Sequence, residues 1–226
     1  MSGINSLKNP TIEGVLDRLH AAARGDRWKF AGLAPQLLLA FLTRKDINEV
    51  ITAERMKDFY IPVSREQGNF LYLVARALNA QRIVEFGTSF GISTIYLAAA
   101  VRDNSGEVVI GTELEPMKHQ KAVENLAAAT LSEVVDIRLG DATETLKDVP
   151  EPIDMVLLDG WKDLYLPVLK LLTPRLRKGA VVLADNIYTF KKSLRPYVEY
   201  VQSGDNGFQS ETLSISDGFE FSVFEG

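Results

Sequence analysis

Cysteine is absent from this chain of 226 residues, so neither a disulfide framework nor thiolate chemistry is available to it. Only two histidines occur, His20 and His119, and neither lies near a cluster of other metal-ligating residues, which argues against a histidine-rich zinc site. The net charge of −5 and the lack of a dense Lys/Arg segment argue against a nucleic-acid partner. The N-terminal residues MSGINSLKNP lack the apolar core of a signal peptide.

Long hydrophobic runs are also absent. The longest apolar run contains Leu37–Leu42 and is far shorter than the roughly 20 residues that a membrane span needs. A content of 46% hydrophobic and 24% charged residues is typical of a soluble globular domain. We therefore expect a cytoplasmic protein with neither a membrane nor a nucleic acid as partner.

The length fits one α/β domain over residues 1–226, with residues 1–58 as a helical N-terminal cover and residues 59–226 as the core that carries the site. Helical periodicity predicts Thr11–Arg24, closed by Gly25, then Ala34–Thr43 and Asp46–Tyr60. The apolar helix Ala34–Thr43 fits either buried core or the face of a homodimer.

From residue 64 onward, strands and helices alternate. The segment Ser64–Gln67 is a capping box, which predicts a helix that runs to about Asn79. The strands and helices expected next are Arg82–Phe86, Ile92–Val101, Val108–Thr112, Pro116–Ala129, Val134–Arg138 and a short helix from Ala142. Such alternation is typical of a doubly wound, mostly parallel sheet. Two final strands, Phe208–Ser214 and Phe219–Phe224, surround a turn signal and predict antiparallel pairing at one edge.

Two short apolar runs, Met155–Leu158 and Ala180–Ala184, have the pattern of strands buried on both faces. The crossover helix expected between them, Leu164–Leu176, makes the two strands parallel and most often adjacent.

Polar residues follow both of these strands. Asp159 comes directly after the first strand, and Asp185 and Asn186 come after the second. Because neighbouring parallel strands end at the same edge of the sheet, these three side chains should converge where open sheets bind ligands. Their oxygens suit a hard cation such as Mg²⁺. An acid at such a position is also a common helix N-cap, but two acids and an amide together favour the metal site.

A glycine loop, with the sequence EFGTSFG, joins the first strand to its helix. Gly87 and Gly91 permit a tight turn and close approach of a ligand, and the free N–H groups near Ser93 suit a small carboxylate. The spacing is neither the G-x-G-x-x-G of dinucleotide folds nor a phosphate loop. Glu113 ends the second strand, where it can accept bonds from a ribose, and Asp141–Ala142 follows the third, where an adenine can lie. Together these features favour a nucleoside-bearing ligand over glycines that serve packing alone.

The segments VEFGTSFGIS, GTELEP, LGDA, LLDGWKDLYLP and LADN resemble class I S-adenosylmethionine-dependent O-methyltransferases, and more narrowly the metal-dependent catechol O-methyltransferase type. The resemblance covers about residues 59–226. It implies a seven-stranded sheet whose last strand is antiparallel, S-adenosylmethionine as cofactor, and Mg²⁺ or another divalent cation such as Mn²⁺. The residues expected at the cofactor are Val63, Glu85, Gly87, Ser89, Gly91, Ser93, Glu113, Asp141, Ala142, Asp159 and Trp161.

The same resemblance assigns the metal to Asp159, Asp185 and Asn186, and the role of general base to Lys162. It places Glu220 against the second hydroxyl of the acceptor, although a solvent-exposed acid is equally compatible with the sequence. For Lys162 the structural alternative is a surface lysine, and for Trp161 it is a core tryptophan instead of a wall of the site.

Further candidates for lining the acceptor pocket are Tyr188, Phe190 and Phe59–Tyr60. We therefore predict a Mg²⁺-dependent O-methyltransferase that acts on a vicinal dihydroxy-aromatic small molecule. The alternatives are a larger acceptor such as a caffeoyl thioester or a natural-product intermediate, a nicotinamide-dependent oxidoreductase, and a non-enzymatic cofactor-binding module.

Overall fold

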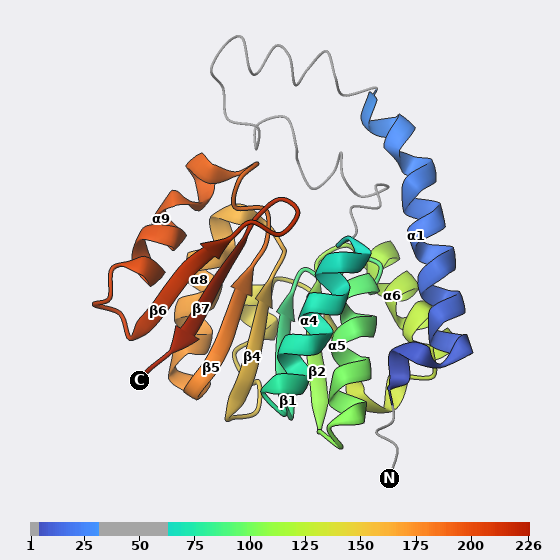
Figure 1. The fold of residues 1–226 in the computed structure, drawn as a ribbon, viewed down its shortest axis with the longest axis horizontal. Helices are drawn as coiled ribbons and strands as arrows, with labels where there is room; N and C mark the ends of the chain where they lie inside the picture. Colours follow the sequence, from blue (N-terminus) through green and yellow to red (C-terminus); the bar gives the residue numbers. More distant parts are fainter. Residues whose placement is uncertain (1–4, 32–62) are drawn as a thin grey trace.

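Seven strands form one mixed sheet in the order β3-β2-β1-β4-β5-β7-β6 (Figure 1). The structure is a computed structural model and describes residues 5–31 and 63–226. The strands are β1 (Arg82–Phe86), β2 (Val108–Glu113), β3 (Val135–Leu139), β4 (Ile153–Leu158), β5 (Leu176–Ala184), β6 (Phe208–Leu213) and β7 (Phe219–Phe224). Strands β1 to β5 pair in parallel, whereas β7 is antiparallel to both β5 and β6. The predicted doubly wound sheet with an antiparallel edge is confirmed.

Helices cover both faces of this sheet. They are α1 (Pro10–Ala31), α4 (Arg65–Ala77), α5 (Ile92–Asp103), α6 (Pro116–Ala128), α7 (Ala142–Thr145), α8 (Tyr165–Leu172) and α9 (Lys191–Gln202), with 3₁₀ turns η1 (Ser6–Lys8), η3 (Ser132–Val134), η4 (Lys162–Leu164) and η5 (Thr173–Arg175). Within the described ranges no helix is long and apolar enough to cross a membrane.

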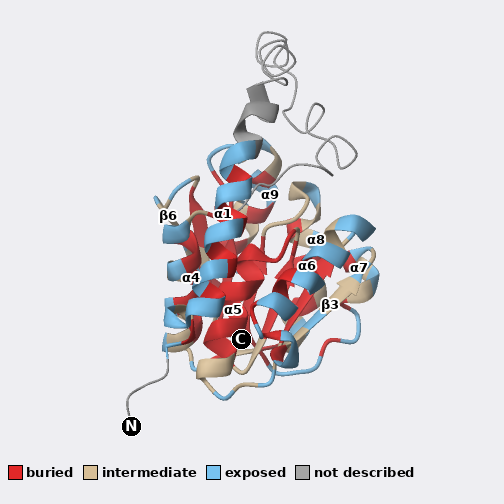
Figure 2. Ribbon diagram, turned by 90° about the vertical axis from the view of Figure 1, so that its right-hand side faces the viewer, coloured by how far each residue is buried: buried red, intermediate tan, exposed pale blue. Residues whose placement is uncertain are grey.

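Alternate residues along each central strand enter two separate cores. In β4, Met155 and Leu157 pack with α1, α4, α5 and α6, whereas Val156 and Leu158 pack with α7, α8 and α9. Both sets are fully buried, which explains the continuous apolar run in the sequence. Figure 2 shows the buried residues concentrated in the sheet and on the inner faces of the helices.

Three helices differ from what the sequence predicts. Helix α1 continues past Gly25 to Ala31, because a glycine inside a helix costs only about 1 kcal/mol and no proline lies between Gly25 and Ala31. The crossover α-helix ends at Leu172 and passes into the 3₁₀ turn Thr173–Arg175, because Pro174 has no N–H for a further α-helical hydrogen bond, and β5 begins at Leu176. Helix α9 was not predicted, because Pro196 within it disfavours an α-helix.

The structure describes only part of the predicted N-terminal helices. Helix α1 packs on α5 and α6, outside the first layer of helices (Figure 1). The predicted helices Ala34–Thr43 and Asp46–Tyr60, with the pocket candidates Phe59–Tyr60, lie outside the described residues.

Candidate active site

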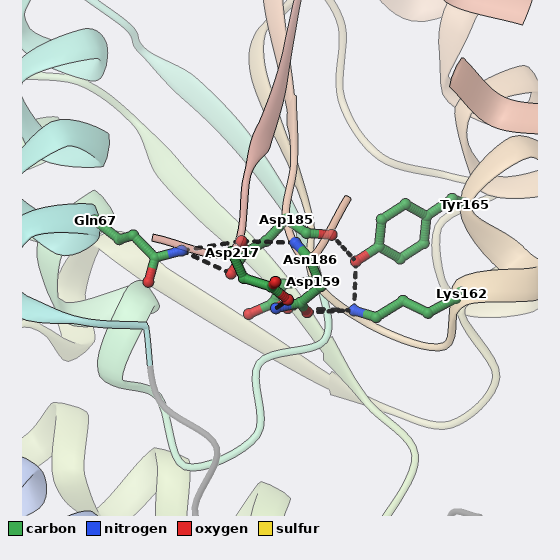
Figure 3. A network of polar contacts seen from close by, with 7 residues as sticks. All are labelled: Gln67, Asp159, Lys162, Tyr165, Asp185, Asn186 and Asp217. Carbon is green, nitrogen blue, oxygen red and sulfur yellow. Dashed lines mark hydrogen bonds and ion pairs between the residues drawn. The ribbon is translucent and has the colours of Figure 1, made fainter. Parts of the chain in front are cut away.

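The ends of β4 and β5 bring together the two acids and the amide predicted to hold a metal. The backbone N–H of Asp185 donates to the carbonyl of Leu158 at 3.0 Å, which keeps the two strand ends adjacent. The ammonium of Lys162 lies 2.7 Å from Oδ1 of Asn186 and 3.6 Å from Oδ1 of Asp159 (Figure 3). The oxygens of two strand ends therefore converge on one positive charge.

Burial dominates the electrostatics of these acids. It raises the pKa of Asp159 to about 6, although the Lys162 ammonium opposes the rise. Burial, and next the charge of Asp159, raise the pKa of Asp185 to about 7. Burial also lowers the pKa of Lys162, against the opposing effect of both carboxylates. Two carboxylates that ionise reluctantly beside one lysine form an environment that a divalent cation relieves.

The donor set fits a hard divalent cation. It consists of two carboxylates and one amide oxygen, which are the ligand types that Mg²⁺ and Mn²⁺ accept. Among residues 5–31 and 63–226, no group of three or more His, Cys, Asp or Glu side chains is arranged for a metal, so a cation held here would need the amide as its third donor.

The raised pKa of Asp185 leads to a prediction about stability. In EDTA, wild-type protein should lose unfolding free energy relative to Asp185→Asn as the pH rises from 4 to 8, because the folded protein binds the Asp185 proton more tightly than the unfolded chain. Below pH 4 the carboxyl is protonated in both states and the difference levels off. Urea unfolding of both proteins at several pH values measures this difference in unfolding free energy. Hydrogen bonds lost in the variant cost the same at each pH, and a pH-independent difference would contradict the prediction.

Lys162 is held in one place by an aromatic residue of the next turn. It lies in η4 instead of an α-helix, and its side chain is 9% exposed, which excludes the surface alternative. Its ammonium lies 2.7 Å from the hydroxyl of Tyr165 and 5.4 Å from the centre of the Phe190 ring. The Tyr165 hydroxyl in turn donates to the carbonyl of Asp185 at 3.3 Å. The amine is thus aimed at the converging oxygens.

Besides Tyr165, two polar partners of the site were missed from the sequence. Asp217 accepts a bond from Nδ2 of Asn186 at 3.3 Å, and Gln67 donates to both oxygens of Asp185 at 2.9 Å (Figure 3). In the sequence Asp217 is a turn residue and Gln67 is part of a capping box. A further signal for Asp217 is its place in the loop before the strand that pairs with β5.

Glu220 lies elsewhere. Its carboxylate is fully buried beneath α9, where it accepts bonds from Gln202 at 2.7 Å, Ser210 at 2.6 Å and Thr212 at 2.5 Å. The solvent-exposed alternative is therefore wrong, and the side chain is not among those that line the pocket described below. The reason is the pleat of the strand, since Phe219 and Phe221 face the opposite core. Asp217 is the acid that the tertiary structure places beside Asn186.

The glycine loop packs directly against the loop that carries Asp159. A Cβ at Gly87, whose φ is +102°, would lie 2.6 Å from the carbonyl oxygen of Asp159. Gly91 has a φ of +83° and is the N-cap residue of α5. Both glycines are thus required by the backbone, and the first brings the two loops into contact.

Polar side chains organise this loop from within. The carboxylate of Glu85 is fully buried, its Oε2 accepts bonds from Thr88 at 3.0 Å and Thr94 at 2.5 Å, and its Oε1 has no hydrogen-bond partner among the described residues. Burial raises the pKa of Glu85, and the surrounding hydroxyls oppose the rise. Glu113 accepts the N–H of Ser89 through Oε2 at 2.7 Å, which ties the loop to the end of β2.

One cavity runs along the carboxyl edge of the sheet from the glycine loop to Lys162. It is lined by seven of the residues expected at the cofactor, namely Gly87, Ser89, Glu113, Asp141, Ala142, Asp159 and Trp161. Lys162 and Phe190 line it as well. The other four expected residues, Val63, Glu85, Gly91 and Ser93, are not in the lining, and Val63, Glu85 and Ser93 are buried. Tyr188 is also outside the lining and bonds to Ser214 at 2.7 Å.

The sheet order, the glycine loop and a cavity at the carboxyl edge together define a class I methyltransferase. Residues 84–187 match the family described as a methyltransferase domain. TomG, an O-methyltransferase of Streptomyces achromogenes solved in complex with SAM, superposes with a TM-score of 0.68 at 28% identity, covering 77% of this chain and 86% of that one.

One of the similar proteins matches this chain along almost its whole length. Catechol O-methyltransferase B of Danio rerio is 32% identical over 95% of this chain and 84% of its own length. Catechol O-methyltransferase of Mycobacterium tuberculosis is 34% identical over 56% of this chain and 57% of its own. The chain belongs to the catechol O-methyltransferase family, and it is an S-adenosylmethionine-dependent O-methyltransferase.

Proposed function

We propose that this enzyme requires a divalent cation, Mg²⁺ or Mn²⁺, and methylates one hydroxyl of a catechol-type acceptor. The observation that carries the proposal is the place of Lys162. Its ammonium lies 2.7 Å from the Asn186 oxygen and 3.6 Å from Asp159, at one end of the cofactor cavity. A proton acceptor thus lies beside oxygens that can bind a cation, at the end of the cavity that would hold the methyl group of the cofactor.

We expect S-adenosylmethionine to bind along the cavity in one direction. Asp141 and Ala142 lie at the adenine end, and Glu113 is placed to accept bonds from the ribose hydroxyls. The hydroxyl of Ser89 lines the cavity and suits the methionine portion, whereas the fully buried Glu85 organises this loop from within through Thr88 and Thr94. Bound in this direction, the cofactor supplies an electrophilic methyl group on sulfur.

Asp159, Asp185 and Asn186 would hold the metal. When bound, the cation acidifies and orients an acceptor hydroxyl. The unprotonated amine of Lys162 takes the hydroxyl proton, the oxygen forms its bond to the methyl carbon, and the carbon–sulfur bond breaks to leave S-adenosylhomocysteine. The remaining residues orient the partners: Tyr165 holds the amine, and Trp161 and Phe190 offer flat walls for an aromatic ring.

An activity screen tests this proposal. The purified enzyme is incubated with S-adenosylmethionine and either catechol, phenol, or caffeoyl-CoA, with Mg²⁺ or with EDTA. We expect methylation of catechol with Mg²⁺ and none with EDTA. Turnover of the thioester alone would replace the acceptor with the larger class, whereas undiminished activity in EDTA would remove the metal from the proposal.

A further inference from the structure

We propose that Gln67 is a positioning residue that holds the carboxylate of Asp185 ready for the divalent cation. The inference rests on the proposed function, because it assigns a role toward the metal. Gln67 touches neither the cavity nor the converging oxygens around Lys162, so it acts through Asp185.

The contact joins two distant parts of the chain. Nε2 of Gln67, in the first turn of α4, lies 2.9 Å from both Oδ1 and Oδ2 of Asp185, which is 118 residues further along the sequence (Figure 3). Each side chain is 3% exposed. A buried amide that faces both oxygens of one carboxylate fixes the plane in which that carboxylate lies.

The capping box determines which end of the amide faces Asp185. Oε1 of Gln67 accepts the backbone N–H of Ser64 at 2.9 Å, and a backbone N–H can only donate. The other end, Nε2, must therefore point to the carboxylate. The hydroxyl of Ser64 accepts the N–H of Gln67 at 3.1 Å and completes the box. A motif that ordinarily only starts a helix thus also orients a donor into the site.

The backbone that carries Gln67 is held firmly. The next residue, Gly68, packs against the ring of Tyr96 in α5 so closely that a Cβ would overlap the ring atoms. Helix α4 therefore lies close against α5, in the position from which Gln67 reaches Asp185.

A neutral donor suits this place. Asp185 Oδ1 accepts two bonds, from Gln67 and from the N–H of Asn186 at 2.7 Å, whereas Oδ2 accepts one from Gln67. Lone pairs remain on the carboxylate for a cation. A lysine or arginine at position 67 would bring a positive charge that competes with the metal, but the amide orients the ligand and leaves its charge available. Partners of this kind typically change metal affinity 10- to 100-fold.

The test compares two variants that damage the same capping box. Gln67→Met removes the donor to Asp185 with little change in volume, whereas Ser64→Ala removes only the hydroxyl half of the box. The dissociation constant of Mn²⁺ is measured by calorimetry on the full chain without acceptor, together with thermal unfolding and S-adenosylmethionine binding. We expect Gln67→Met to bind Mn²⁺ about 10- to 100-fold more weakly, and Ser64→Ala to stay within about 3-fold of wild type, an allowance for indirect effects of the lost cap.

Steady-state kinetics supply a second measurement. If Gln67 only positions the metal ligand, Gln67→Met should raise the Mg²⁺ concentration needed for half-maximal rate and recover most of kcat at saturating Mg²⁺. Equal Mn²⁺ affinity in wild type and Gln67→Met would overturn the positioning role and leave the proposed function intact. If wild-type protein binds no Mn²⁺ at all, the metal-dependent function and the role of Gln67 both fall.

Discussion

Replacing Lys162 with methionine is expected to lower kcat for methyl transfer by about 10²- to 10⁴-fold, the usual contribution of a positioned general base. The side chain is buried beside Asp159 and Asn186, whereas Lys118, the other lysine in the cavity lining, lies over the ring of Phe90. Methionine is similar in length but accepts no proton. Single-turnover rates with saturating S-adenosylmethionine and catechol measure the chemical step directly.

The variant Lys162→Arg tests whether Lys162 acts as a base or only as a positive charge beside Asp159. Arginine keeps the positive charge next to Asp159 but does not give up its proton, so it should be nearly as slow as methionine if Lys162 is the base. The wild-type rate should also rise with pH as the amine loses its proton, and burial lowers the pKa of Lys162 so that this limb begins below the range of an exposed lysine. A rate within a few-fold of wild type in Lys162→Met would remove the residue from this role.

Replacing Asp185 with alanine is expected to abolish methyl transfer while S-adenosylmethionine still binds. Loss of a residue that only supports a metal ligand already costs about 10- to 100-fold, and the loss of the ligand itself should exceed that. Asp185 is not in the cavity lining, so the cofactor contacts at Ser89 and Glu113 remain. Turnover assays and calorimetry with S-adenosylmethionine measure the two quantities on the same preparation.

Two controls accompany this variant. Asp163→Ala removes an exposed acid from the neighbouring turn and should leave the rate unchanged. Glu113→Ala should weaken the binding of S-adenosylmethionine and still transfer the methyl group when the cofactor is saturating. A lost hydrogen bond to a charged group is worth about 1.5–3 kcal/mol, or roughly 10- to 100-fold in cofactor affinity. Catalysis by Asp185→Ala near the wild-type rate, with the dependence on Mg²⁺ retained, would exclude Asp185 as a metal ligand.

Much of the fold could be predicted because its signals are local. The buried strands β1, β2 and β4 are short apolar runs, and the glycines at 87 and 91 mark a turn that the backbone requires, as their positive φ values show. Helix ends and the helix α9 were less predictable. Pro196 disfavours a helix at α9, and the packing of α9 on β6 and α8, which stabilises it, is not visible in the sequence.

The candidate site also has features that the sequence predicts and others that only the tertiary structure decides. That Asp159, Asp185 and Asn186 lie at neighbouring strand ends could be predicted from the sequence, because strands joined by one crossover helix are parallel and most often adjacent. The family signature of the glycine loop and of LLDGWKDLYLP likewise lies in contiguous residues. The place of Glu220 does not follow, because it depends on which face of β7 lies under α9. Only the tertiary structure could join Gln67 to Asp185 and Asp217 to Asn186, since these contacts span 118 and 31 residues and arise from how a helix and a loop pack against the sheet.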